Sequence, residues 1–374
     1  MVELGFYLSA LAVLIWGITL LLPWQPWRSR EVLQPEDFDE DYDLSDITVV
    51  IPARDEAGVI AETLASLKQQ GRGLKVIVVD DESSDGTADI ARASGLAGLK
   101  VIESAPLPAG WTGKLWAQEQ GLSHVETGLT LLLDADIALR PGMIKGLKQK
   151  YLAGDVQFIS LMAVLRFDSF WEKVLMPAFI YFFKMIYPFA LANEPSSKMA
   201  AAAGGCILVE TEALRKIGGM ASIRDAVIDD CTLAKTIKNS GYNTWIGLTH
   251  GVISQRPYGN LAEIWQMVAR TAYTQLNYSL LLLLACTFLM LLLYWWPLLA
   301  LFYFSGEALV LNLFSLFLMM LMVWPTLRFY SFNPLWALLM PAVACLYLMM
   351  TWTSAIRYWR GERSRWKGRS YLTE

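Results

Sequence analysis

Carboxylates stand at the ends of several short apolar runs in the chain. Asp80 and Asp81 follow the run at residues 75–79, and Asp134 and Asp136 follow the run at 129–133. Alternate residues of an extended chain share a face, so both carboxylates of an Asp-x-Asp segment can bind one hard cation. That spacing alone is as typical of a turn as of a metal site. Together with the acidic residues that follow the other runs, it favours a divalent metal.

Other polar residues near these runs suit a phosphate-bearing ligand. Pro52, Arg54 and Glu56 follow the apolar run at 48–51, and Lys114 follows a loop that contains two glycines. A lysine at the start of a helix, after such a loop, can contact phosphate, although alone it would be only a surface charge. The chain contains neither G-x-G-x-x-G nor a P-loop motif. A bound nucleotide would therefore have its phosphates held by a metal and by side chains.

These residues fall on an alternation of predicted strands and helices. Continuous apolar, β-branched runs separated by helices of ordinary length indicate a parallel sheet covered on both faces. Such sheets bind ligands beyond the carboxyl ends of their strands, and the expected fold class is α/β. The predicted strands are 48–51, 75–79, 100–102 and 129–133, and the predicted helices are 57–70, one that begins near 87, and 115–125.

Two consecutive glycines precede a further predicted strand at 206–209. Gly204 and Gly205 would permit a close approach of the backbone to a ligand, and a simple turn is nearly as good an interpretation.

Composition excludes several classes of protein. The chain has 374 residues, of which 55% are hydrophobic and 18% charged, and its mean hydropathy is +0.38. Ordinary soluble domains are roughly 45–50% apolar and about 25% charged, so a uniformly soluble fold and a disordered chain are both excluded. Four cysteines without a C-x-x-C pair, and only two histidines, argue against a disulfide scaffold and a zinc site. A net charge of −4 argues against a general nucleic-acid binder.

The apolar excess is concentrated in four runs without any charged residue. A helix needs about 20 apolar residues to cross a bilayer. The first run lacks the basic start and small-residue cleavage site of a signal peptide, and Trp24 and Trp27 after it are typical of the membrane interface. We therefore expect an anchor that is retained. The four runs are 4–22, 280–304, 308–327 and 335–356.

The basic residues that flank these runs predict an orientation and also a conflict. Arg28 and Arg30 predict that the chain after them is cytoplasmic, and the basic tail at 357–374 is expected there too. Three full crossings after residue 280 would place the tail on the opposite side. One later segment is therefore expected to be re-entrant or to lie along the membrane, and the sequence does not indicate which one.

The expected organisation has five parts. Within the α/β part, a largely apolar helix is expected at about 170–192, and it carries Glu172, Lys173 and Lys184. We interpret this helix as interfacial, an entrance for a lipid acceptor. The alternative is a buried core helix. The parts are an N-terminal membrane anchor at 1–30, an acidic, solvated linker at 31–46, an α/β domain at 47–275, a transmembrane region at 276–356 and the basic tail at 357–374.

In these residues the chain resembles the family 2 glycosyltransferases of the GT-A fold. The matching segments are 50–56, 79–87, 113–114, 134–136 and 228–230. More closely, the chain resembles the hopene-associated glycosyltransferases of bacterial hopanoid pathways. That likeness covers nearly the whole chain, through segments 110–116, 200–206, 228–231, 256–258, 267–275, 325–330 and 366–369.

The resemblance implies a membrane-bound enzyme that moves a sugar, with inversion, from a nucleotide-diphosphate donor to a hopanoid-like lipid acceptor at the bacterial inner membrane. Asp134 and Asp136 would hold Mg²⁺ or Mn²⁺, and Asp229 and Asp230 would form the catalytic pair, with Asp230 as the base. The donor-binding residues implied are Pro52, Arg54, Glu56, Asp80, Asp81, Lys114, Gly205, Gln266 and Arg270.

One motif departs from the family pattern. Many membrane members carry Q-x-x-R-W at the product site, whereas here Gln266 and Arg270 are four residues apart and Thr271 follows. The pair still shares a helical face. Two alternatives remain at this point: transfer to another lipid, such as a polyprenyl phosphate or a ceramide-like molecule, and a non-catalytic membrane protein that binds nucleotides. The complete acidic set argues against the latter, because binding alone needs no base.

Overall fold

The computed structural model describes residues 2–366 and 369–372, which form two compact units. The first, here called the sheet unit, consists of residues 31–166 and 189–257. The second, here called the helical unit, consists of residues 1–30, 167–188 and the chain from 258 onward. Residues 167–188 and 258–275, which lie within the domain predicted at 47–275, belong to the helical unit. The predicted tail is described except for residues 367–368 and 373–374.

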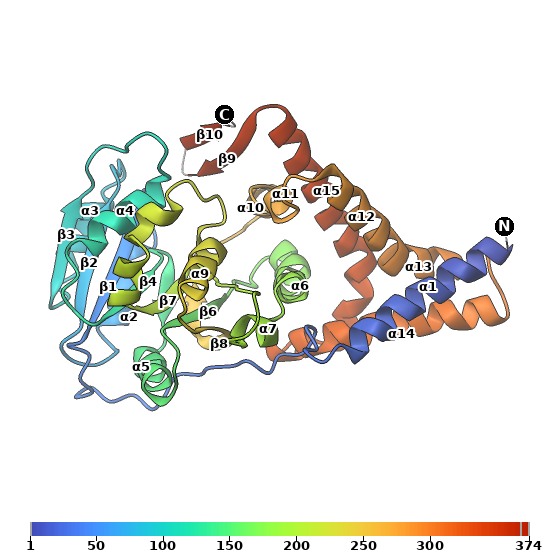
Figure 1. Ribbon diagram of the computed structural model, residues 1–374, viewed down its shortest axis with the longest axis horizontal. Helices are drawn as coiled ribbons and strands as arrows, with labels where there is room; N and C mark the ends of the chain where they lie inside the picture. The colour runs from blue at the N-terminus through green and yellow to red at the C-terminus, as the bar shows by residue number, and fades with distance from the viewer. Residues whose placement is uncertain (1, 367–368, 373–374) are drawn as a thin grey trace. The chain divides into compact units, whose positions relative to one another are not determined.

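The sheet unit is built on one eight-stranded mixed sheet, with helices on both sides (Figure 1). The strand order is β3-β2-β1-β4-β7-β6-β8-β5. The four strands predicted first pair in parallel, as expected, whereas β7 lies antiparallel to both β4 and β6. The strands are β1 (Ile47–Ala53), β2 (Lys75–Asp80), β3 (Leu99–Glu103), β4 (Leu129–Leu133), β5 (Ile137–Leu139), β6 (Phe158–Val164), β7 (Cys206–Glu210) and β8 (Thr244–Ser254).

Two hydrophobic cores lie on opposite faces of this sheet. Val49 packs into the core that contains α2 and α5, and its neighbour Val50 packs into the core that contains α4 and α9. Leu131 and Leu132 divide between the cores in the same way, because successive side chains of a strand point to opposite faces. The helices are α2 (Ile60–Leu67), α3 (Thr87–Ala93), α4 (Gly113–Leu122), α5 (Met143–Ala153), α7 (Phe189–Asn193), α8 (Thr211–Lys216), the 3₁₀ turn η1 (Gly219–Ile223) and α9 (Asp229–Asn239).

The acidic segment 31–46 lies along the sheet unit. Its backbone forms bridges from Val32 to Leu248 and from Asp43 to Arg72, and the Leu44 side chain is fully buried. Most of its acidic side chains are exposed, as a solvated linker would have them. The segment is thus solvated in its side chains but attached to the fold through its backbone.

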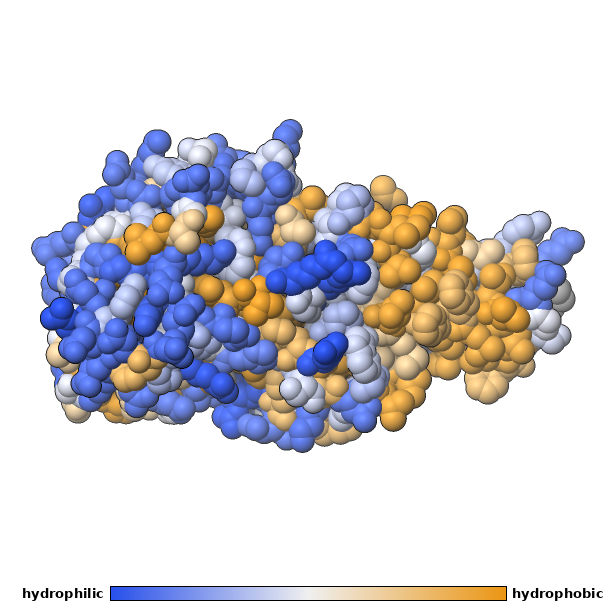
Figure 2. Space-filling view, turned by 90° about the horizontal axis from the view of Figure 1, so that it is seen from below, coloured by the Kyte–Doolittle hydropathy of each residue, from blue (hydrophilic) through white to orange (hydrophobic). Residues whose placement is uncertain are grey.

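The helical unit contains four helices long and apolar enough to cross a membrane. They are Glu3–Leu21, Leu280–Ala300, Glu307–Phe329 and Pro334–Trp359. They overlap the four predicted apolar runs, of which the first two extend beyond their helices, to residues 22 and 304. Large apolar side chains are exposed on them, such as Leu14, Phe317 and Leu281, and Figure 2 shows an apolar surface over this part of the chain. A soluble protein rarely exposes so extended an apolar surface.

The elements of the helical unit follow the chain in this order: α1 (Val2–Leu21), α6 (Phe170–Ile186), α10 (Leu261–Ala269), α11 (Ala272–Gln275), α12 (Leu280–Met290), the π-helical turn η2 (Leu291–Trp295), α13 (Trp296–Ala300), α14 (Glu307–Phe329), the 3₁₀ turn η3 (Pro334–Leu339), α15 (Met340–Trp359), and the paired strands β9 (Glu362–Trp366) and β10 (Arg369–Leu372).

The helix expected at 170–192 is α6, which ends at Ile186. Glu172 and Lys184 are both buried in it. Glu172 forms a capping box with Ser169, and Lys184 Nζ donates to the carbonyl of Arg28 at 3.2 Å and to Ser29 Oγ at 2.8 Å. These two charges therefore bind partners within the helical unit, and the relation of α6 to a membrane surface stays a prediction.

Candidate active site

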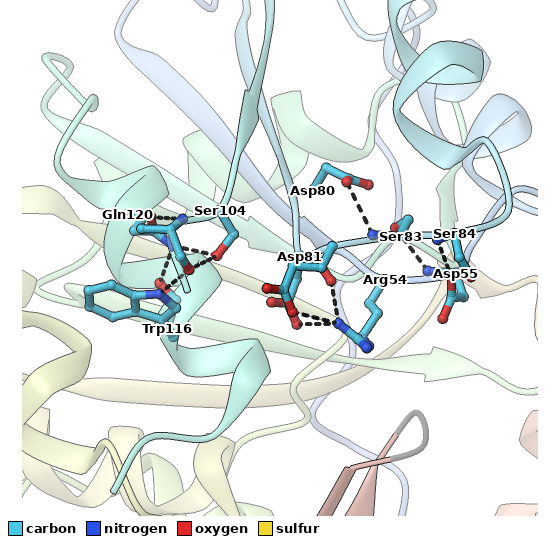
Figure 3. Close-up of polar contacts among 11 residues, drawn as sticks. Arg54, Asp55, Asp80, Asp81, Ser83, Ser84, Ser104, Trp116 and Gln120 are labelled. Carbon is cyan, nitrogen blue, oxygen red and sulfur yellow. Dashed lines mark hydrogen bonds and ion pairs between the residues drawn. The ribbon is translucent and has the colours of Figure 1, made fainter. Parts of the chain in front are cut away.

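The ends of β1 and β2 are joined through Arg54. Its Nη1 donates to the backbone carbonyl of Asp81 at 2.6 Å and lies 3.7 Å from the Asp81 carboxylate and 3.6 Å from that of Glu82 (Figure 3). Asp81 and Asp80 are both buried. Register explains the contact, because Ala53 pairs with Asp80 and the Asp81 amide donates to the Ala53 carbonyl at 2.8 Å.

The loops after β1 and β2 hold each other in place. Asp55 N donates to Ser83 Oγ at 3.0 Å, and Ser84 N donates back to Asp55 Oδ1 at 2.9 Å (Figure 3). Asp55 and Glu82 both have positive φ, +49° and +55°, a conformation that costs energy for residues other than glycine. Such strain is typical of functional sites, and here it occurs in two loops at one edge of the sheet.

The Asp-x-Asp segment is a turn directly after β4, and its carboxylates pair with different cations, Asp134 with Lys114 and Asp136 with Arg256. Ile137 N donates to the Asp134 carbonyl at 3.1 Å, and Thr63 of α2 donates to the Ala135 carbonyl at 2.8 Å, which fixes the turn against the core. Burial raises the pKa of Asp134, and the nearby charge of Asp136 raises it further. The turn interpretation of the spacing is therefore confirmed, and the metal interpretation stays a prediction.

Lys114 joins the Asp-x-Asp turn to the acidic pair at the start of α9. Its Nζ lies 2.8 Å from Asp134 Oδ1 and 3.4 Å from Asp229 Oδ2. Burial lowers the pKa of Lys114, but the carboxylates of Asp134 and Asp229 more than offset this, and the pKa is raised above its usual range. The lysine is therefore a permanent cation of the site.

Asp230 is held by backbone amides. Gly204 N donates to its Oδ2 at 2.9 Å, and Cys231 N donates to its Oδ1 at 2.7 Å. Burial, together with the charge of Asp229, raises the pKa of Asp230 to about 6. A carboxylate with this pKa is ionised at neutral pH and can still accept a proton readily, which suits a general base. A pocket beside it is lined by Lys114, Gln118, Gly204, Asp229 and Asp230.

The two glycines before β7 have different surroundings. A Cβ on Gly204 would lie 3.3 Å from Lys114 Nζ and 3.4 Å from Asp230 Oδ2, so its backbone borders the charged cluster closely. A Cβ on Gly205 would instead lie 3.1 Å from Ile137 Cδ1, and the Gly205 carbonyl accepts from Asp134 N at 3.0 Å. Gly204 faces the site, whereas Gly205 positions the Asp-x-Asp turn.

Two parts of the site were given no role from the sequence, although segments 110–116 and 256–258 carry the family resemblance. Arg256, just after β8, places Nε 3.3 Å from Asp136 Oδ2 and Nη2 3.4 Å from Glu56 Oε1. No local pattern connects residues 200 positions apart. The signals that could have suggested a role for Arg256 are the end of a strand shortly before it and its place in the matching segment 256–258.

The second unnoticed part is the loop before α4. Trp116 Nε1 donates to the Ala105 carbonyl at 2.9 Å, and Gln120 binds Ala105 N and Ser104 Oγ, each at 2.7 Å (Figure 3). These bonds tie α4, the helix that carries Lys114, to the end of β3.

The remaining predicted residues lie inside the sheet or in the other unit. Pro52 is buried within β1, where it pairs with Val79. Gln266 and Arg270 belong to the helical unit, in and just after the last turn of α10, and both are exposed. The sheet unit thus brings together all the predicted residues except these last two.

The carboxylates fit a metal whose coordination is completed by substrate. Nowhere in residues 2–366 and 369–372 do three or more His, Cys, Asp or Glu side chains meet in a way that could hold a metal. Mg²⁺, however, is usually bound through one or two carboxylates together with substrate phosphates. Asp134 and Asp136 supply two carboxylates from one turn, which agrees with that second arrangement.

The fold and the strand-end site define the class of protein: an α/β domain of the GT-A, nucleotide-diphospho-sugar transferase type, attached to apolar N-terminal and C-terminal helices. Residues 48–218 match the family model described as "Glycosyl transferase family 2". This segment is therefore a family 2 glycosyltransferase domain, and the predicted enzyme class, a glycosyltransferase, is confirmed for the domain.

Curated relatives match about a third of the chain. The chain is 34% identical over 128 residues to a 4,4'-diaponeurosporenoate glycosyltransferase of Staphylococcus aureus, a match that covers 34% of each chain. An enzyme of the same name from Staphylococcus haemolyticus is 34% identical over 125 residues, or 33% of this chain and 32% of that one. The chain therefore matches about a third of the length of these relatives.

A solved structure has the same fold over nearly the whole chain. It is a mannosyltransferase from Pyrobaculum calidifontis in complex with GDP-Man and Mn²⁺, with a TM-score of 0.54 and 19% sequence identity. The likeness covers 94% of this chain and 98% of that one. At this identity the comparison concerns the fold alone.

Proposed function

We propose that the chain is an integral membrane glycosyltransferase that moves a sugar from a nucleotide-diphosphate donor to the hydroxyl of a lipid acceptor, with inversion. The observation that carries this proposal is the cluster of Lys114, Asp134, Asp229 and Asp230. It combines a permanent cation, a carboxylate suited to a metal and a carboxylate suited to act as a base.

Asp230 is the base in this proposal. It accepts the proton of the acceptor hydroxyl while that oxygen forms a bond to the anomeric carbon, and the bond from that carbon to the diphosphate oxygen breaks. The amides of Gly204 and Cys231 hold its carboxylate in one orientation. Asp229 is less suited to this role because it faces the Lys114 ammonium.

The leaving nucleoside diphosphate is stabilised by positive charge. Lys114 supplies a fixed cation beside the Asp-x-Asp turn. Asp134 and Asp136 would hold Mg²⁺ or Mn²⁺, and such an ion neutralises charge on the diphosphate when it is bound. The Mn²⁺ in the mannosyltransferase of the same fold supports a divalent metal here. Arg54 and Asp81 would hold the nucleoside, from the loops after β1 and β2.

The acceptor is a lipid, and we propose a hopanoid-like one. The apolar helices support a membrane acceptor, and the relative named as a 4,4'-diaponeurosporenoate glycosyltransferase is consistent with a small-molecule acceptor that is not a protein. The hopanoid assignment rests on the motif resemblance described above. Arg28 and Arg30 support a location in the bacterial inner membrane with the sheet unit in the cytoplasm, where nucleotide sugars are made. A polyprenyl phosphate or a ceramide-like lipid is the alternative acceptor.

The direct test is an activity screen. Detergent-solubilised protein is incubated with Mg²⁺ or Mn²⁺, a panel of nucleotide sugars and lipid fractions from bacteria with and without hopanoids. We expect a new glycolipid by mass spectrometry only where hopanoids are present, and none from the matched variant Asp230→Asn. A glycolipid formed from both fractions would contradict the hopanoid assignment alone. Binding of a nucleotide sugar without any product would contradict the enzyme.

A further inference from the structure

Helix α15 has the length of a membrane-spanning helix, but each of its ends contacts a different helix of the unit. It begins after η3, which packs along α14, eleven residues beyond the end of α14. Near its other end, the Tyr358 ring stacks on Tyr278 with ring centroids 4.2 Å apart. Tyr278 directly precedes Ser279, the N-cap of α12. Thus α15 runs from the end of α14 to the start of α12.

The end of α14 and the start of α12 lie at the same end of the bundle. Helices α12 and α13 run in one direction and α14 returns along α13 and η2, because α13 and α14 pack together on either side of the short turn 301–306. The turn marks one end of this hairpin. The start of α12 and the end of α14 therefore mark the opposite end.

Contacts of α1 fix the same direction independently. Gly5 lies against the Phe304 ring, Ser9 accepts a hydrogen bond from Trp296 Nε1 at 3.1 Å, and the Trp16 ring lies 5.5 Å from that of Tyr294. From the start of α1 toward its end, the contacted residues thus lie first in the turn 301–306, then in α13 and then in η2. The start of α1 lies beside the turn, and its end points the same way as the end of α14. Figure 1 shows α1 and α14 side by side, with α15 drawn across their far end.

Charge differs between the two ends of this bundle. Glu3 and Glu307 lie in the first turns of α1 and α14, at the end that contains the turn 301–306. Arg328 and Arg357 lie in the last turns of α14 and α15, at the opposite end, and Arg30 follows α1 there. Cytoplasmic flanks of membrane helices carry the excess of Lys and Arg. This end of the bundle therefore has the charge of a cytoplasmic face.

We infer that α15 lies in the cytoplasmic interface of the membrane and that only α1, α12–α13 and α14 cross. This arrangement places residues 31–275 and the basic tail on the same side, which removes the conflict between the charge pattern and four crossings. The partner of α15 is the inner leaflet: its exposed Met349, Ile356 and Trp359 enter the upper acyl region, while Arg357 and Arg360 meet anionic headgroups.

Single-cysteine labelling tests this topology. The four native cysteines are replaced by alanine, and Ser305→Cys, Ser331→Cys and Glu362→Cys are introduced one at a time. A membrane-impermeant maleimide is added to intact and to permeabilised spheroplasts. We expect residue 305 to react in intact spheroplasts, and residues 331 and 362 to react only after permeabilisation.

The comparison that decides is between residues 331 and 362, which flank η3 and α15. Labelling of the two from the same side supports an interfacial α15, whichever way the protein is oriented. Labelling from opposite sides means that α15 crosses, and it overturns the inference. Labelling of residue 305 from the same side as 331 would overturn the crossing of α14.

A matched pair of lysine substitutions tests depth. Met349 and Phe317 are exposed residues near the middle of α15 and of α14 respectively. A lysine at the centre of a crossing helix opposes insertion, whereas an interfacial lysine reaches the headgroups. We expect Met349→Lys to keep the wild-type yield of membrane-inserted protein and Phe317→Lys to lose most of it. Equal losses would contradict an interfacial α15.

Discussion

At the scale of single residues, the neighbours Asp229 and Asp230 have different partners despite their adjacency. Asp229 faces the Lys114 ammonium, and Asp230 accepts hydrogen bonds from two backbone amides. The first arrangement neutralises a carboxylate, whereas the second orients one. In the proposed mechanism this difference gives the pair separate tasks, charge balance for Asp229 and proton transfer for Asp230, and each task can be tested by substitution.

Asp230→Asn keeps the size of the side chain but removes its ability to accept a proton. We expect sugar transfer to fall by about 10²–10⁴-fold, the usual contribution of a general base, while donor binding is retained. Turnover and calorimetric binding of the nucleotide sugar are measured on the same preparation. Asp229→Asn is the matched control and should be milder. An inactive Asp229→Asn beside a near-normal Asp230→Asn would assign the base to the other residue.

The raised pKa of Asp230 predicts a pH dependence. Burial and the charge of Asp229 raise its pKa to about 6, so the carboxyl holds its proton at lower pH and cannot act as a base there. Transfer should therefore rise with pH through about 6 and level off above pH 7. The rate of single-turnover transfer across pH 5–8 measures this limb. If the residual transfer rate of Asp230→Asn still rises with pH through about 6, the group that titrates is not Asp230.

Substitutions of Asp136 and Arg256 can distinguish loss of a proposed metal ligand from loss of the ion pair between these two residues. Asp136→Ala removes a carboxylate from the Asp-x-Asp turn, so donor binding should weaken and its dependence on added Mg²⁺ or Mn²⁺ should disappear. Arg256→Gln breaks the same 3.3 Å ion pair but leaves both carboxylates, and it should keep the metal dependence. Donor affinity is titrated with and without metal. A metal-dependent Asp136→Ala would remove this residue from the proposed metal site.

At the scale of elements, helix α4 depends on close packing against the sheet. A Cβ at Gly121 would lie 2.5 Å from Val50 Cγ1 and 3.1 Å from Val79 Cγ2, so any side chain there pushes the helix away from β1 and β2. Overpacking of this kind costs about 1–3 kcal/mol. Because α4 begins at Gly113 and Lys114, the displacement would also reach the site.

We therefore expect Gly121→Ala to lower the thermal unfolding midpoint of the solubilised protein and to reduce transfer. The matched control is Gly128→Ala, where an added Cβ has nothing within 4 Å. Unfolding is followed by intrinsic fluorescence. Equal midpoints for the two variants would show that α4 moves freely enough to accept the methyl group.

The elements that sequence predicted best are those whose signal is local. Each of the first four strands was placed to within two residues of its observed bounds. β1, β2 and β4 are apolar runs because both of their faces are buried, whereas β3 lies at the edge of the sheet and is only partly buried. β6 was not predicted, and the antiparallel position of β7 depends on pairing between residues far apart in sequence. The role of Arg256 was missed for the same reason, since β8 brings it to Glu56 and Asp136 only in the folded chain.

At the scale of the whole molecule, sequence predicted which segments are membrane helices but not which of them cross. The span that contains α14 has 23 residues and a hydropathy of 2.1, and the span that contains α15 has 26 residues and a hydropathy of 1.7. Both are long and apolar enough to cross a membrane. Their difference lies in contacts such as Tyr358 with Tyr278, which no hydropathy pattern contains. The charge pattern had indicated that one segment does not cross, and the contacts identify it.

The orientation of the sheet unit is the last prediction, and the supply of donor depends on it. Arg28 and Arg30 follow α1, and cytoplasmic flanks carry the excess of basic residues, so residues 31–166 and 189–257 should be inside the cell. A protease added to intact spheroplasts should leave this unit uncut, and the same protease should cleave it after permeabilisation. The acidic segment 31–46, with its exposed side chains, is the expected first site of cleavage. Cleavage in intact spheroplasts would place the unit outside, away from cytoplasmic nucleotide sugars, and would contradict both the orientation and the proposed donor.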